Sequence, residues 1–243
     1  MCGIVGIYYK NKELNKHLGS MLAAMLEQMS ERGPDSAGVA VYRNTVKPPN
    51  TKLTLHSADP EYDWNRFCIL LEEALGAKTE IEVRVSHAVL VTNAVFSELS
   101  TWLAVNCPAL RVMSAGSTIE IYKEKGTPRE FVDRFQLQDI QGSHALGHTR
   151  MATESAVTTQ HSHPFSTGLD LCLVHNGSLS NHNRLREQLQ LEGIEFQTDN
   201  DSEVAAGYLM WQLHQGASLK QALTSAIKDL DGFYTFAVGF FTP

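Results

Sequence analysis

The chain has 243 residues, and its 27 acidic side chains outnumber its 20 lysines and arginines, which gives a formal net charge of −7. This balance argues against the basic face that nucleic-acid binding needs, so we expect no nucleic-acid partner. No apolar run approaches the roughly 20 residues that span a bilayer, so we expect no membrane-spanning segment. No basic-then-apolar leader opens the chain, and the four cysteines lie far apart without a CxxC pair, which is typical of a cytoplasmic protein with reduced thiols.

Residues 1–50 predict two strands with a helix between them. The apolar run from Ile4 to Tyr9 is typical of a buried strand, and Val39 to Tyr42 predicts another. Between them, apolar residues recur at helical spacing: Leu14, Leu18, Met21, Leu22, Met25 and Met29. Such a stripe indicates an amphipathic helix that packs on a core. Lys47-Pro48-Pro49-Asn50 then breaks the chain.

Residues 51–141 predict a separate α/β block, which we expect to form an inserted subdomain. Its patterns predict these elements in order: a helix over 64–75, an alternating strand over 81–91, a helix over 94–105, and strands at 110–113 and 119–122. The turn Ser114–Ser117 between the last two favours a hairpin. Thr127 and Pro128 are typical of a helix start.

The remaining segment predicts strands near 145–149 and 171–175 and then helices. Helices are expected over 180–192 and 201–215, because Gly193 and Gly216 follow them as C-terminal glycines. Ser218 and Gln221 form a capping box for a third helix. The last segment, 233–241, predicts an apolar strand that stops without a polar ending.

Cys2 becomes the N-terminal residue once the initiator methionine is removed. A terminal cysteine carries a nucleophilic thiol beside an α-amine whose pKa, about 7.7–8.0, lets it accept the thiol proton near neutral pH. Position alone favours an ordinary buried cysteine at the start of a strand, and the rest of the sequence reverses this preference.

Three further segments carry residues suited to a reaction of an amino acid. Residues 31–38 place Arg32 and Asp35 in a glycine-flanked tight loop, where the two would hold each other, although a solvated turn has the same composition. Arg150, at the end of a predicted strand, could bind a carboxylate with two parallel hydrogen bonds or pair with a neighbouring acid. Asn176 and Gly177 could supply two N–H donors of an oxyanion hole or form a simple turn.

Taken together and in this order, the motifs resemble those of the class II, N-terminal-nucleophile glutamine amidotransferases. The resemblance is carried by these segments: Cys2, RGPDSAG, GHTRMAT, HSHP, HNG and NDSE. It covers residues 1–43 and 142–240 and implies one glutamine amidotransferase domain over 1–243. Domains of this family continue with more strands, so the resemblance implies that this one is truncated at its C-terminal end and that its incomplete second sheet exposes an edge. The implied fold class is α+β, a four-layer αββα sandwich of two antiparallel sheets.

The resemblance implies a thiol-dependent hydrolysis of the glutamine side-chain amide. Cys2 would be the nucleophile, with its own amine as base, and Asn176 and Gly177 would form the oxyanion hole. A glutamyl thioester would form and be hydrolysed, releasing glutamate and ammonia. No cofactor is implied.

The same resemblance implies residues that bind and support the substrate. Arg150 and Thr153 would bind the α-carboxylate of L-glutamine, and Asp201 its α-ammonium group. Arg32 would be a structural arginine near the nucleophile, and His163 a histidine that supports the site.

A narrower resemblance is to the GlxB-type subunit, also called the A subunit of N-methylglutamate synthase and related to glutamate synthase. It is carried by the string from Met151 to Thr159 and by the long block of residues 51–141. It implies a glutamate-synthase-like flavin subunit and a GXGXG-repeat subunit as partners. Met151 and Glu154 depart from the tryptophan and histidine of the glucosamine-type synthases, in a loop that covers glutamine.

Other interpretations remain at this stage. Histidines cluster in the second half of the chain: His144, His148, His161, His163, His175 and His182. They lack an HExxH motif or a cysteine pair, so we expect no metal. A catalytically silent scaffold or regulatory subunit is a non-enzyme alternative. A hydrolase of another amide is disfavoured, because Arg150 and Asp201 together suit a free amino acid.

Overall fold

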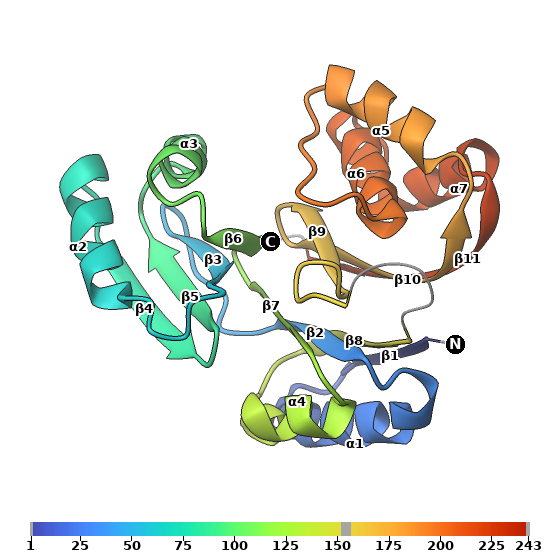
Figure 1. Cartoon of the computed structure of the whole chain (residues 1–243), viewed down its shortest axis with the longest axis horizontal. Helices are drawn as coiled ribbons and strands as arrows, with labels where there is room; N and C mark the ends of the chain where they lie inside the picture. The colour runs from blue at the N-terminus through green and yellow to red at the C-terminus, as the bar shows by residue number, and fades with distance from the viewer. Residues whose placement is uncertain (1, 152–156, 242–243) are drawn as a thin grey trace.

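The computed structural model describes residues 2–151 and 157–241. Within these residues the strands form three sheets, and all the strand pairs are antiparallel (Figure 1). Every helix in the described part of the chain is too short or too polar to cross a bilayer.

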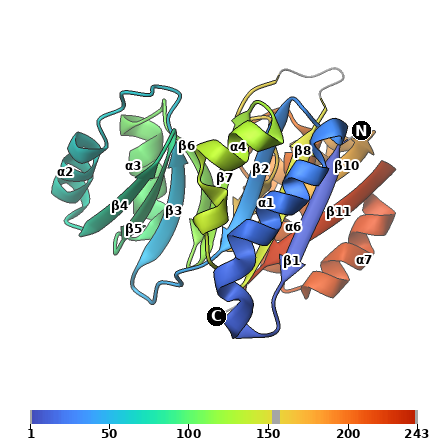
Figure 2. The same cartoon turned by 90° about the horizontal axis from the view of Figure 1, so that it is seen from below.

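The first sheet contains the strand that follows Cys2. Its strands, in spatial order, are β1 (Gly3–Tyr8), β8 (His144–Arg150), β2 (Ser36–Tyr42) and β7 (Ile119–Lys125). Helices α1 (Leu18–Gln28) and α4 (Pro128–Arg134) lie across its outer face (Figure 2). Leu22, Leu26 and Phe131 pack there against Val39. The expected helix is confirmed, but its stripe only in part: Leu18 and Leu22 are buried, whereas Met21 is exposed. Leu14 is exposed too and lies in a separate 3-10 helix. Strand β1 is an edge strand with alternating burial rather than a fully buried one.

The second sheet packs on the inner face of the first. Its order is β11 (Gly232–Phe240), β10 (Leu171–Leu179) and β9 (Phe165–Gly168). Its outer face is covered by helices α5 (His182–Leu191), α6 (Asp201–His214) and α7 (Leu219–Asp229). Between the sheets, Tyr42 and Ile121 pack against Cys172. The layers therefore run helix, sheet, sheet, helix, which confirms the αββα sandwich (Figure 1).

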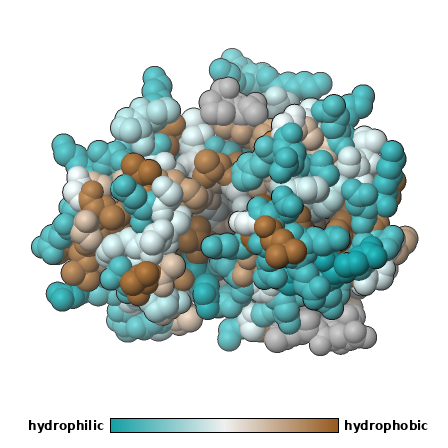
Figure 3. All heavy atoms as spheres, turned by 90° about the horizontal axis from the view of Figure 1, so that it is seen from above, coloured by the Kyte–Doolittle hydropathy of each residue, from teal (hydrophilic) through white to brown (hydrophobic). Residues whose placement is uncertain are grey.

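A third sheet lies beside this sandwich. Its strands are, in spatial order, β4 (Thr79–Arg84), β5 (His87–Thr92), β3 (Thr51–His56) and β6 (Arg111–Gly116). Helices α2 (Trp64–Leu75) and α3 (Phe96–Asn106) pack on one face through Leu71 and Leu103. Apolar side chains remain exposed on these helices, and Figure 3 shows apolar surface on this side of the molecule. The alternating segment 81–91 is two strands, because the chain turns at Val85, whose φ is +58°.

The expected boundary of the inserted block is wrong at its C-terminal end. Strand β7 and helix α4 fall within residues 51–141, yet β7 pairs with β2 over seven residues in the first sheet. The expected hairpin of β6 with β7 is also wrong, since the two strands belong to different sheets. The Asp170 carboxylate accepts the main-chain N–H groups of residues 117–119 and so redirects the chain between them. We propose residues 51–116 as the inserted subdomain.

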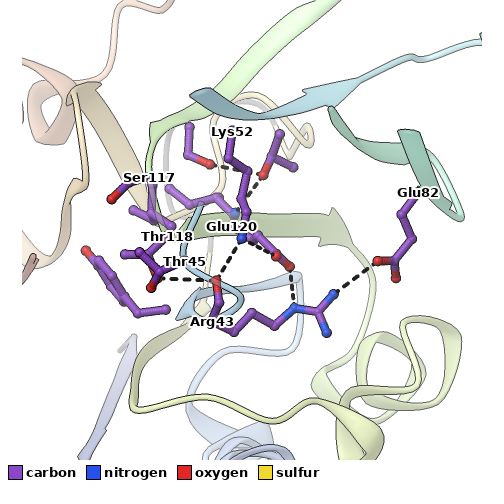
Figure 4. Close-up of polar contacts among 12 residues, drawn as sticks. Arg43, Thr45, Lys52, Glu82, Ser117, Thr118 and Glu120 are labelled. Atoms are coloured by element: carbon purple, nitrogen blue, oxygen red, sulfur yellow. Dashed lines mark hydrogen bonds and ion pairs between the residues drawn. The ribbon is translucent and has the colours of Figure 1, made fainter. Parts of the chain in front are cut away.

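A buried ion cluster joins the insert to the first sheet (Figure 4). Lys52 on β3 lies 3.1 Å from Glu120 on β7, and Arg43 lies 2.6 Å from the other oxygen of that carboxylate. Tyr122 donates a third hydrogen bond to Glu120 at 2.7 Å. Burial lowers the pKa of Lys52, although Glu120 opposes this shift. Since each charge has a partner, this contact fixes the orientation of the insert rather than adding much stability.

Candidate active site

Cys2 lies beside the end of strand β8. It precedes β1, whose first residue Gly3 is paired with Thr149 at the end of β8. The half-buried Cys2 thiol faces the main-chain oxygen of Met151 at 4.0 Å. A β-carbon at Gly3 would lie 2.7 Å from Thr149 Oγ1, so a side chain there would displace β1 from β8. Cys2 is thereby held beside Arg150 and Met151.

The glycine-rich loop after α1 packs directly against the end of β8. Asp35 donates its main-chain N–H to the oxygen of Arg150 at 3.0 Å. A β-carbon at Gly33 would lie 2.3 Å from the carbonyl carbon of Thr149, so only glycine allows this approach. Arg32 is exposed, and the ion pairs among the described residues do not include one between Arg32 and Asp35. The expectation that these two hold each other is wrong, because main-chain bonds to β8 fix the loop instead.

Strand β10 brings Asn176 to the nucleophile from the second sheet. The side-chain amide of Asn176 donates to the main-chain oxygen of Cys2 at 3.2 Å. Gly177 has φ +143°, and a β-carbon there would lie 2.0 Å from the oxygen of Phe233. Only glycine fits this position on β10, and it leaves the Gly177 backbone exposed.

Arg150 is buried at the end of β8 and holds a neighbouring loop. Its guanidinium donates to the main-chain oxygen of His161 at 3.3 Å. His161 in turn contacts the Asp199 carboxylate at 2.9 Å, and Asp199 precedes α6. Thr153 and Glu154 lie outside the described residues, so their expected places in the site stay predictions. Met151 is described and is 37% exposed.

Asp201 is the first residue of α6. Asn200 caps this helix by accepting the Ser202 N–H at 2.8 Å. The Asp201 carboxylate accepts the main-chain N–H of Leu179 at 2.9 Å, and Leu179 ends the strand that carries Asn176 and Gly177. A carboxylate at a helix N-terminus is stabilised by the exposed N–H groups there. The Asp201 carboxylate is therefore held at the end of the strand that carries Asn176 and Gly177.

Three buried histidines, His148, His163 and His175, contact one another in the interior. His163 stacks on His148 with ring centroids 4.1 Å apart, and His148 donates to the oxygen of His175 at 2.9 Å. Burial lowers the pKa of His148 to about 3 and also lowers the pKa values of His163 and His175. The rings are therefore neutral at physiological pH. Sequence reasoning gave His163 a supporting role but assigned none to His148 or His175, after weighing all three in a metal site and expecting none.

Sequence reasoning also missed Lys123, which holds the loop that carries His163. Its ammonium group donates to the main-chain oxygens of Gln160, Ser162 and Pro164 at 3.2, 2.9 and 3.2 Å. Three acceptors match the three donors of a protonated lysine. Burial lowers the pKa of Lys123 to about 7, and nearby Glu203 opposes this shift. A single lysine in a strand carries no sequence signal for such a role.

Among the described residues, no three His, Cys, Asp or Glu side chains are grouped as metal ligands. The fold holds the Cys2 thiol, the Asn176 amide, the Arg150 guanidinium and the Asp201 carboxylate by contacts from four separate segments.

Comparisons with known proteins agree with this arrangement. Residues 148–240 match the family described as a glutamine amidotransferase domain. The chain is 51% identical over 240 residues to the glutamine amidotransferase-like protein GlxB of Rhizobium meliloti (strain 1021), covering 98% of this chain and 79% of that protein. It is 34% identical over 123 residues to a glutamine–fructose-6-phosphate aminotransferase (isomerizing) of Vibrio vulnificus (strain YJ016), covering 51% of this chain and 20% of that protein.

A solved structure shares the fold. The allosteric regulatory enzyme of purine biosynthesis superposes with a TM-score of 0.50 at 20% sequence identity, covering 97% of this chain and 34% of that one. At this identity the likeness concerns the fold alone.

Proposed function

We propose that this chain, which belongs to the class II glutamine amidotransferase family, hydrolyses the side-chain amide of L-glutamine through a thioester on Cys2 and supplies the ammonia to a partner. The observation that carries the proposal is the contact of Asn176 with the backbone of Cys2. It places an amide donor from one sheet beside a terminal thiol from the other.

The reaction begins at the terminal amine and thiol. With Met1 removed, the α-amine of Cys2 accepts the thiol proton, and the thiolate attacks the amide carbon of glutamine. Negative charge develops on the amide oxygen, where the Asn176 side-chain N–H and the Gly177 main-chain N–H donate hydrogen bonds. The protonated amine gives its proton to the leaving nitrogen, and ammonia departs. A water molecule then attacks the thioester, releasing glutamate and regenerating the thiol.

Two opposite charges suit the amino-acid end of the substrate. Arg150 would bind the α-carboxylate, with Thr153 as a second donor, and Asp201 would bind the α-ammonium group. The pairing is supported by His161, which contacts Arg150 through its main chain and Asp199 through its side chain. Asp199 lies two residues before Asp201, so the segments that carry the two charges are joined. Arg32 and His163 would support the site without touching the substrate.

The ammonia would pass to a synthase on another chain. The likeness to GlxB supports a complex with a glutamate-synthase-like flavin subunit and a GXGXG-repeat subunit. We expect the isolated chain to hydrolyse glutamine slowly and a docked partner to accelerate it, because the loop with Met151 and Glu154 must close over the substrate before chemistry.

Release of glutamate and ammonia from L-glutamine tests the proposal. The chain with a free Cys2 amine should produce both in equal amounts, and Cys2→Ala should produce neither while keeping the same circular dichroism spectrum. If the unsubstituted chain and the Cys2→Ala variant hydrolyse glutamine at the same rate, the proposed chemistry is refuted.

A further inference from the structure

Ser202 is a buried hydroxyl at the centre of the polar side chains behind the site. It is the second residue of α6 and is 1% exposed. Its oxygen lies 2.8 Å from His163 Nε2, 2.7 Å from His175 Nδ1 and 3.3 Å from Asp201 Oδ1. Three polar groups from three segments thus converge on one hydroxyl.

Only one assignment of hydrogen atoms satisfies all three contacts. A carboxylate only accepts, so the single hydroxyl hydrogen of Ser202 goes to Asp201. The two lone pairs of the oxygen then accept N–H groups from His163 and His175. The opposite ring nitrogens, His163 Nδ1 and His175 Nε2, are buried and have no hydrogen-bond partner among the described residues. They must be unprotonated, because a buried N–H without an acceptor is costly.

This assignment fixes both oxygens of the Asp201 carboxylate. Oδ1 accepts the hydroxyl of Ser202, and Oδ2 accepts the main-chain N–H of Leu179. Each carboxylate oxygen has a second lone pair, which stays free for a substrate. The Ser202 hydroxyl is in turn oriented by two histidines whose positions are set by the loop at 163 and by β10.

We propose that Ser202 is a positioning residue that aims the Asp201 carboxylate at the α-ammonium group of glutamine. This inference rests on the proposed function, in which Asp201 binds that ammonium group. Ser202 acts through Asp201 and does not contact substrate. Removing its hydroxyl leaves the Asp201 carboxylate held by the hydrogen bond from the Leu179 N–H, so its orientation is less restricted and recognition of the ammonium group weakens while the rest of the site is retained.

The test compares two ligands that differ only in the ammonium group. L-Glutamine and 4-carbamoylbutanoate share the amide and the carboxylate, and the second lacks the α-ammonium group. Binding of each is measured by calorimetry in a Cys2→Ala background, which prevents turnover. Ser202→Ala should raise the Kd of glutamine about 10- to 100-fold, the range for a hydrogen bond to a charged group, and change the Kd of 4-carbamoylbutanoate by less than about twofold.

Two matched variants complete the design. Ser202→Thr restores a hydroxyl and should recover most of the preference for glutamine. Asp201→Asn should lose the same preference, and adding Ser202→Ala to it should cause no further loss. Because the readout is a ratio of two ligands on one preparation, partial misfolding does not imitate the effect.

An equal rise in both Kd values on Ser202→Ala would overturn the inference, since a merely structural serine affects both ligands alike. A chain that binds glutamine without hydrolysing it would refute the proposed function and leave the Ser202 result intact. A chain that binds neither ligand would refute both.

Discussion

The side-chain nitrogen of Asn176 lies 3.2 Å from the main-chain oxygen of Cys2, although the two residues are 174 positions apart in the chain. The contact exists because β1 and β10 belong to two stacked sheets whose ends coincide at this point (Figure 1). Any rearrangement that separates the sheets would therefore move the proposed oxyanion donor away from the nucleophile.

Asn176→Ala should lower kcat for glutamine by about 10²- to 10³-fold, as expected when one oxyanion donor is lost. KM should change little, because the donor acts on charge that develops in the transition state. Steady-state kinetics test this, with Ser178→Ala, an exposed position on the same strand, as the control. A change in KM alone would argue against an oxyanion role.

Arg150→Ala should mainly raise KM for glutamine, by about 10- to 100-fold, since a charge-assisted bidentate bond to the α-carboxylate is lost. Arg150→Lys should recover only part of the loss, because an ammonium group cannot form the forked contact. Arg184→Ala, a surface arginine, serves as the control. An unchanged KM in the folded Arg150→Ala variant would contradict the assignment.

Glu120→Gln should destabilise the protein by about 3 kcal/mol, because Lys52 and Arg43 then lose their buried counter-charge. Glu82 contacts the same Arg43 at 3.5 Å but is 55% exposed, so Glu82→Gln should cost less than about 1 kcal/mol (Figure 4). Urea unfolding of both variants compares them. Equal effects would mean that burial does not decide the strength of this cluster.

Stability should fall as the pH drops below about 6.5, the unfolded value for histidine. Burial lowers the folded-state pKa of His148 to about 3 and keeps that of His163 well below its usual value. The unfolded chain therefore binds more protons in this window, so the stability present above about pH 6.5 is lost on acidification. Urea unfolding at several pH values measures the slope.

Each such histidine contributes about 1.4 kcal/mol per pH unit within the window. His148→Gln should therefore give a shallower slope between about pH 6.5 and about pH 5.5 than the parent chain, whatever its absolute stability. An identical slope would show that His148 titrates alike in the folded and unfolded chain.

Local features were predictable from sequence, and long-range ones were not. The sequence predicted a helix start at Thr127 and a capping box at Ser218 from residues no more than three positions apart, and both are present in the structure. The partner of Ile119–Lys125 is β2, about 80 residues earlier, and the local turn at Ser114 favoured the wrong pairing. No local sequence pattern specifies which distant strand β7 pairs with, or in which register.

The same difference between local and long-range features applies to the active site. Motif order identified Cys2, Arg150 and Asn176, and the fold places all three at the adjoining ends of β1, β8 and β10. The grouping of His163 and His175 around Ser202 depends on three segments meeting, which spacing along the chain does not encode. Thr153 lies outside the described residues and stays a prediction.

Intact-mass spectrometry of the chain, quenched in acid during turnover of L-glutamine, tests whether Cys2 acts as an N-terminal thiol nucleophile. We expect a chain that lacks Met1 and carries one glutamyl group, which peptide mapping places on Cys2 and which hydroxylamine removes as it removes thioesters. An active preparation that retains Met1, or a glutamyl group attached at another residue, would contradict the N-terminal thiol mechanism.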